Sequence, residues 1–350
     1  MTNLRRWTSI FLCGTLLGAA SCSDANAPED VDPAVVASGM AGLTSAFSGN
    51  LAFQSLRELS AQFTFPAAGA ALSATLPPPP GGAPLVTLTP AQRRALLQLS
   101  LHGGSGSLAI FPVDVLGGTF VWDVAQDRYV RSLTATGAPS NGVRFELYLV
   151  DLETHLPQEP LMNVGYVDLT DLSTAQADRL GVLVKYGTQT IASYTVTAAV
   201  STSSVALGAD GYLAGADGTA RLDFVLATTI SSSGFTLDYD LAGSNGFSAS
   251  LVVTVNLVGN TSSLAWRISQ GGNSIEVTGT STATAVNCHI KFNGVMVATA
   301  SGDPDAPTIT GALGHTFTAE ELDDLGDVFE GFFELIDQID GVFSPAGLVF

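Results

Sequence analysis

The sequence predicts an α+β fold, mainly β, in which a large antiparallel sheet carries amphipathic helices from both ends of the chain. Three observations predict it. Apolar residues alternate with a period of two from about residue 107, helical stripes flank this region on both sides, and short turn signals divide it. Helices with one apolar stripe and a sheet with one apolar face can bury both surfaces in two layers. We expect the sheet to curl, or to close partway into a half-barrel meander.

The first expected elements are helices in a segment spanning 32–104. Asp32 followed by Pro33 is a helix-start signal, and Val36, Met40, Leu43 and Phe47 recur at spacings of four and three. Helical periodicity resumes over 51–63 after a break at 48–50. Residues 66–84 contain four consecutive prolines and predict a stiff, extended loop, after which a capping box at 89–92 opens another short helix.

The strands are expected over 107–312. Phe235, Leu237, Tyr239 and Leu241 alternate with polar residues, as a half-buried strand requires. The same alternation occurs over 145–149, 222–226, 251–257, 264–268 and 286–292. Turn signals such as Asn141-Gly142, Asp210-Gly211 and Asp217-Gly218 separate the runs and predict about ten to twelve strands.

The last expected element is an acidic amphipathic helix over 318–343. Thr318-Ala-Glu-Glu321 is a capping box. Apolar residues then repeat every three or four positions, and acidic residues form the opposite stripe. The acidic stripe predicts either a solvated helix face or a docking surface for a basic protein partner.

The N-terminus carries an export signal. Arg5 and Arg6 precede an apolar run from Trp7 to Ala20, too short for a confident transmembrane helix. The run ends in small residues directly before Cys22, which resembles the lipobox of bacterial lipoproteins. The alternative is an ordinary cleaved signal with an incidental cysteine.

The lipoprotein resemblance implies a domain plan and a location. A signal peptide would span 1–21, a polar tether 22–31 and a single β-rich domain 32–350. Lipidation of Cys22 would anchor the protein to a membrane of the bacterial cell envelope, and Ser23 agrees with outer-membrane delivery. The expected domain would then lie in the periplasm or at the cell surface.

Composition excludes several classes of function. The 350-residue chain holds 13 Lys+Arg against 32 Asp+Glu, a formal net charge of −19 that repels phosphate backbones, so we expect no nucleic-acid partner. A hydrophobic content of 46% excludes wholesale disorder.

We find no catalytic motif and no cofactor motif. Cys288 and His289 are strand neighbours that point to opposite faces and cannot act on one atom.

Calcium is the one metal with candidate ligands. Asp210 and Asp217 lie seven residues apart in two Gly-Ala-Asp-Gly segments, and Asp303 and Asp305 form a similar pair. Calcium needs six to eight oxygen ligands, and no stretch resembles an EF-hand loop. Tight Asp-Gly turns therefore explain the two Gly-Ala-Asp-Gly segments better than a metal site does.

The predicted layout is similar, in its fold alone, to periplasmic lipid-handling half-barrels of the lipoprotein-carrier type. We therefore expect a non-enzymatic, membrane-anchored binding protein that holds an apolar or lipid-like ligand between sheet and helices. The alternative is a structural or protein-interaction lipoprotein of the cell envelope that uses its acidic C-terminal helix. A secreted hydrolase is the remote alternative.

Overall fold

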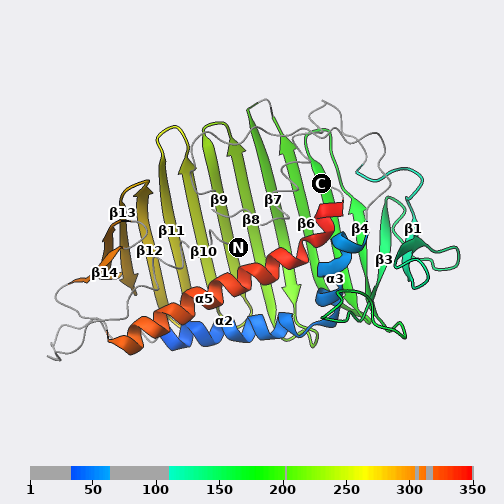
Figure 1. Ribbon diagram of the computed structural model, residues 1–350, viewed down its shortest axis with the longest axis horizontal. Coiled ribbons are helices and arrows are strands. Elements are labelled where there is room, and N and C mark those ends of the chain that lie inside the picture. Colours follow the sequence, from blue (N-terminus) through cyan, green and yellow to red (C-terminus); the bar gives the residue numbers. More distant parts are fainter. Residues whose placement is uncertain (1–32, 64–109, 202, 304–306, 313–317, 349–350) are drawn as a thin grey trace. The chain divides into compact units, whose positions relative to one another are not determined.

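The computed structural model describes residues 33–63, 110–201, 203–303, 307–312 and 318–348. It confirms the predicted fold class, because the described chain is mainly β with a few helices (Figure 1). The predicted signal peptide, tether, proline-rich loop and the helix after it lie outside the described residues. None of the described helices combines the length and the apolar character needed to cross a membrane.

The helices begin and end close to the predicted positions. They are α2 (Pro33–Ser48), α3 (Leu51–Gln62), α5 (Ala319–Val342) and the 3-10 helix η2 (Ser344–Leu348). The predicted break between α2 and α3 is confirmed, because the side chain of Asn50 caps α3 by accepting a hydrogen bond of 3.0 Å from the amide of Ala52.

The strands number fifteen in the described chain, more than predicted. They are β1 (Gly118–Asp123), β2 (Arg128–Arg131), β3 (Gly142–Tyr148), β4 (Asn163–Asp171), β5 (Asp178–Tyr186), β6 (Gln189–Val200), β7 (Ser204–Ala214), β8 (Arg221–Ser231), β9 (Gly234–Gly243), β10 (Ser248–Asn256), β11 (Thr261–Gln270), β12 (Asn273–Thr282), β13 (Val286–Phe292), β14 (Val295–Gly302) and β15 (Thr308–Gly311). They form one sheet that is not closed, with β15 and β2 as its terminal strands.

The sheet is mixed, and this differs from the antiparallel meander that the sequence predicts. Strands β3 to β15 follow one another in sequence order, but β1 lies between β3 and β2. The β1–β3 pair is parallel, with Gly118 opposite Val143 and Phe120 opposite Phe145. Short turns favour antiparallel neighbours, and β1 and β3 can be parallel because β2 and a long connection separate them in the chain.

The described chain divides into two compact units. The β1–β7 unit holds the residues from Leu43 to Ala227 and from Ile336 on, and the β9–β15 unit holds those up to Gly42 and from Thr228 to Leu335. The earlier expectation of a single domain over 32–350 stays a prediction.

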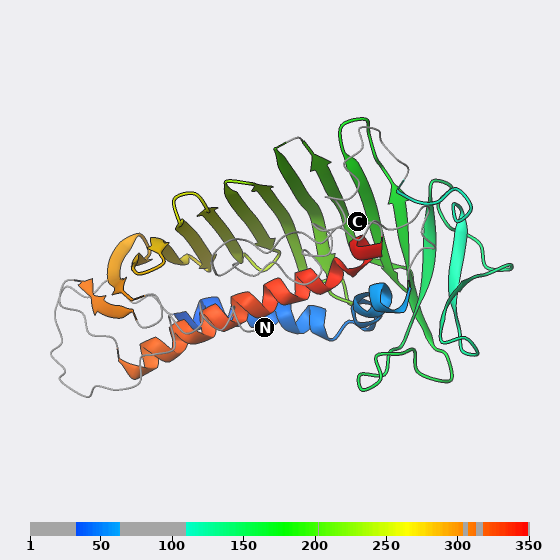
Figure 2. The ribbon, with the colours of Figure 1, turned by 45° about the horizontal axis from the view of Figure 1, so that its top comes forward.

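Within the β9–β15 unit, the predicted alternation places one face of the sheet against helices. Strands β9 to β14 lie side by side in sequence order (Figure 2). Trp266 of β11 packs edge-on against Phe332 of α5, with ring centroids 5.4 Å apart. The start of α2 is joined to the same unit through Asn245, whose side-chain amide donates to the carbonyl of Gly39 over 3.0 Å.

Within the β1–β7 unit, α3 packs on β3, β4 and β5 (Figure 1). The hydroxyl of Ser55 accepts a hydrogen bond of 3.2 Å from the amide of Tyr148, which fixes α3 to the end of β3. The end of α5 is held by Tyr194 of β6, whose buried hydroxyl donates to the carbonyl of Val342 over 2.6 Å. The first contact positions α3 on the sheet, and the second positions the end of α5.

Candidate functional site

The predicted calcium candidates do not form a metal site in the described chain. Asp210 lies inside β7, so the prediction of a turn at Asp210-Gly211 is wrong, whereas Asp217 does lie in a turn after β7. Asp303 is exposed after β14, and Asp305 lies outside the described residues, as does Cys22. Across the described ranges, no three His, Cys, Asp or Glu side chains group together as metal ligands would.

The carboxylate of Asp217 is occupied by its own turn. It accepts hydrogen bonds from the amide of Thr219 at 3.0 Å and from its hydroxyl at 2.8 Å. The hydrogen bond from the Thr219 amide is the main cause that lowers the pKa of this carboxyl below its usual range. These bonds give Asp217 a structural role in the turn.

Cys288 and His289 lie as the strand pattern predicts. The Cys288 side chain is buried on the helix-facing side of β13, and His289 points to the other side. Burial raises the pKa of the Cys288 thiol, so this sulfur stays protonated and unreactive at neutral pH.

A pocket of about 550 Å³ lies in the β1–β7 unit, between the end of α3 and strands β1 and β2. It is lined by residues from two parts of the chain that are distant in sequence: Gln62, Phe63, Asp114, Val115, Phe120, Arg128, Tyr129, Val130 and Arg131. Its volume falls in the range of about 300–1,000 Å³ that is typical of small-molecule sites.

The floor of this pocket is aromatic. Phe63 directly follows α3 and meets Phe120 and Phe145 edge-on, with ring centroids 5.0 and 4.9 Å apart. Phe120 stacks on Phe145 at 4.9 Å, and Tyr129 meets Phe145 edge-on at 5.4 Å. The β1–β2 register places Phe120 and Tyr129 on the same face of the sheet, which builds a continuous apolar surface from two strands and a helix end.

The one polar group in this floor is satisfied. The hydroxyl of Tyr129 donates to the carbonyl of Glu146 over 2.9 Å. Burial is the main cause that raises the pKa of Tyr129 far above its usual value, so the ring stays neutral. The floor is therefore uncharged, although Phe120 and Tyr129 are only 5% and 3% exposed.

The rim of the pocket is charged. Arg128, Arg131 and Asp114 are all exposed. The guanidinium of Arg131 donates to the backbone carbonyls of Asp114 and Leu116, and that of Arg128 donates to the side-chain oxygen of Gln126 at 2.6 Å. The pocket thus combines an apolar floor with cationic groups at its opening, which suits an amphipathic ligand.

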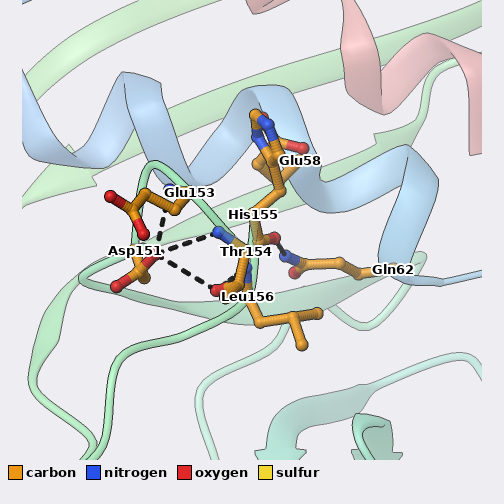
Figure 3. Close-up of polar contacts among 7 residues, drawn as sticks. All are labelled: Glu58, Gln62, Asp151, Glu153, Thr154, His155 and Leu156. Carbon is orange, nitrogen blue, oxygen red and sulfur yellow. Dashed lines mark hydrogen bonds and ion pairs between the residues drawn. The ribbon is translucent and has the colours of Figure 1, made fainter.

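A loop between β3 and β4 is fastened to the helix that lines the pocket (Figure 3). His155 Nδ1 lies 3.1 Å from Glu58 Oε1, and the side-chain amide of Gln62 donates to the carbonyl of His155 over 2.6 Å. Glu58 and Gln62 are four residues apart and so share one face of α3. Gln62 therefore both lines the pocket and holds this loop.

The loop is shaped from within by Asp151. Its Oδ1 accepts hydrogen bonds from the amides of Glu153 and Thr154, both at 2.9 Å, and from the Thr154 hydroxyl at 3.3 Å (Figure 3). The hydrogen bond from the Thr154 amide is the main cause that lowers the pKa of the Asp151 carboxyl. The carboxylate thus holds the loop in the conformation that presents His155 to α3.

The His155–Glu58 pair does not form a nucleophilic site with its neighbour Thr154. A hydroxyl nucleophile has to lie within hydrogen-bond reach of the histidine that activates it. The Thr154 hydroxyl is bonded to Asp151 instead, and the His155 side chain is 64% exposed. The contacts around His155 are those of a fastened loop.

No family model matches the chain, and searches of curated proteins and of solved structures also find no match.

No motif in the sequence indicates this pocket. Phe63 lies at the end of the helical pattern over 51–63, and Phe120 lies in the predicted strand region, more than fifty residues later. One signal was available, because Arg128-Tyr-Val-Arg131 places two arginines within four residues of a chain that holds only 13 Lys+Arg.

Proposed function

We propose that this protein is an exported, lipid-anchored binding protein of the bacterial cell envelope that holds a small apolar or lipid-like ligand. The observation that carries the proposal is the aromatic floor of the pocket between α3 and strands β1 and β2. A cavity of about 550 Å³ with an apolar floor and a few polar groups at its opening is typical of small-molecule binding sites.

The absence of a catalytic constellation from the sequence supports a binding role over hydrolysis. Among the described residues that line the pocket, the titratable side chains are Asp114, Arg128, Tyr129 and Arg131. Tyr129 donates to a backbone carbonyl, and both arginines donate to neutral oxygens. These groups can orient a ligand, and the hydroxyl of Tyr129, the only hydroxyl among the described lining residues, donates to a carbonyl and not to a base that could activate it.

Lipid anchoring rests on the sequence before and after Cys22. Replacing Cys22 with Ser should release the protein from membranes and stop lipid-dependent processing, measured by membrane fractionation and by the mass of the mature chain. Unchanged membrane association and mass would refute anchoring at this residue.

Ligand binding is tested on the purified full-length mature protein. Native mass spectrometry and solvent extraction should find an apolar molecule bound at one per chain. Replacing Phe120 with Ala removes a ring from the pocket floor and should reduce this occupancy, whereas replacing Leu241 with Ala, in the β9–β15 unit, should not. Hydrolase activity that is lost when Asp114 is changed to Asn would overturn the binding role.

A further inference from the structure

The two arginines at the pocket differ from three other arginines of the described chain, which lie beside carboxylates, and resemble Arg179 of β5, which has no ion pair within the described ranges. Arg144 is bonded to Asp168 at 2.7 Å, Arg221 to Asp223 at 2.6 Å, and Arg267 lies 3.5 Å from a carboxylate oxygen. Within the described ranges, neither Arg128 nor Arg131 lies within ion-pair distance of a carboxylate, although acidic residues outnumber basic ones by 32 to 13.

Arg131 is held in place rather than free in solvent. The β1–β2 register puts it opposite Phe120, on the same face of the sheet as the aromatic floor. Its guanidinium packs against Gly118, where an added Cβ would lie only 3.0 Å from its Nε. Its two bonds to the carbonyls of Asp114 and Leu116 occupy two of the five N–H donors of a guanidinium. Arg131 is nonetheless exposed, and it lines the pocket.

We infer that the pocket takes an amphipathic anion, whose apolar chain lies against Phe63, Phe120 and Tyr129 and whose carboxylate or phosphate head binds Arg131, the arginine of β2 that shares their face of the sheet. This inference rests on the proposed function and names the class of its ligand. A planar guanidinium with fixed orientation binds carboxylate and phosphate groups through paired hydrogen bonds. The net charge of −19 repels anions overall, so an anion can bind here only through direct contacts with a positively charged group.

The position of the arginines has one other explanation. β2 is a terminal strand of only four residues, and charged side chains on such strands prevent pairing with other chains. This explanation predicts that ligand affinity does not depend on the charge of the ligand head. Asp114 also lines the pocket, and Arg131 donates to its backbone carbonyl, so an acidic residue directly contacts the proposed head-group site. Binding of an anion at Arg131 therefore has to outweigh repulsion by Asp114.

The test compares ligands of equal chain length on the full-length mature protein. Dodecanoate, dodecyl phosphate and neutral dodecanol are titrated below their aggregation concentrations by isothermal calorimetry. We expect at least one of the two anions to bind tenfold or more tightly than dodecanol. Preference for dodecanoate over dodecyl phosphate, or the reverse, identifies the head group.

Three variants assign the effect to Arg131. Arg131→Gln should weaken binding of the anion about tenfold and leave dodecanol unchanged, and Arg131→Lys should give an intermediate loss because it keeps the charge but not the planar fork. Arg179→Gln, which removes one positive charge from β5 of the same unit, should change neither. Circular dichroism checks that each variant is folded.

The outcomes separate the two claims. Equal affinity for the anions and dodecanol, or an anion affinity that Arg131→Gln leaves unchanged, overturns the inference and leaves the proposed pocket intact. Failure of all three compounds to bind a folded protein overturns the proposed function as well.

Discussion

Gly279→Ala should destabilise the β9–β15 unit, because this glycine lies directly opposite Cys288 in the β12–β13 register. A Cβ at position 279 would lie 2.3 Å from Cys288 Sγ, 2.6 Å from the carbonyl oxygen of Asn287 and 2.8 Å from Cys288 Cα. Two of these contacts are with backbone atoms, so a change of side-chain rotamer cannot relieve them. The strands would have to move apart.

The expected cost follows from two opposing effects. Overpacking a well-packed core costs about 1–3 kcal/mol, and the backbone contacts place Gly279→Ala near the upper value. Replacing glycine by alanine in a strand regains about 0.5–1 kcal/mol of backbone entropy. We therefore expect a net loss of about 2 kcal/mol in the free energy of unfolding.

Urea unfolding of four proteins measures this effect: the wild type, Gly279→Ala, Cys288→Ala and the double variant. Removing the Cys288 sulfur should relieve the shortest contact but neither of the backbone contacts. The double variant should therefore be more stable than the sum of the single effects predicts, by about 1 kcal/mol. If Gly279→Ala is as stable as the wild type, or if the two changes are additive, the proposed steric conflict with Cys288 is wrong.

Three further predictions concern the β1–β7 unit. Tyr194→Phe should cost about 1–3 kcal/mol of unfolding free energy, because it leaves the buried carbonyl of Val342 without its 2.6 Å hydrogen bond; no loss in urea unfolding would contradict this. Arg144→Gln should cost about 1–3 kcal/mol by removing both hydrogen bonds to Asp168, at 2.7 and 2.8 Å, and Asp168→Asn in the same background should recover part of the loss in thermal unfolding. Since the folded-state pKa of Asp151 is lowered, its contribution to stability is present above the unfolded pKa of about 3.9 and is lost as the pH falls through the folded value. Carboxyl NMR titration should find the pKa of Asp151 below about 3.9, and a value above this would refute the hydrogen-bonded loop.

The sequence predicts most of the secondary structure because the local patterns are strong. The C-terminal helix was expected over 318–343 and is observed over Ala319–Val342, since the capping box and the apolar stripe both act within a few residues. The strand around Tyr239 follows its alternation, with Tyr239 and Leu241 buried and Asp238 and Asp240 exposed. The parallel β1–β3 pair has no such local signal.

The misassigned turn at Asp210-Gly211 shows why a local signal can mislead. Gly211 lies in β7 directly opposite Tyr194, and a Cβ there would lie 2.4 Å from that of Tyr194. The glycine is therefore required because it leaves room for Tyr194 of the neighbouring strand, whose hydroxyl donates to the carbonyl of Val342. In a sequence, Asp-Gly can mark either a tight turn or a strand position that must lack a side chain. Only the partner strand distinguishes the two.

Gly279 and Gly211 have the same role in different units of the chain, since each leaves space for a side chain on the neighbouring strand. Other mid-strand glycines in long sheets can be interpreted in the same way. Each lies opposite a residue whose side chain is buried on the helix-facing side: Cys288 in one case and Tyr194 in the other. In a sheet with one apolar face, a mid-strand glycine lets the partner's side chain occupy the space that its own would fill. The pocket cannot be read in this way, because Phe63, Phe120 and Arg131 come together only when α3 packs on the sheet. The aromatic floor forms only in the tertiary structure. The two arginines of β2, which lie at the rim, are close together in the sequence as well.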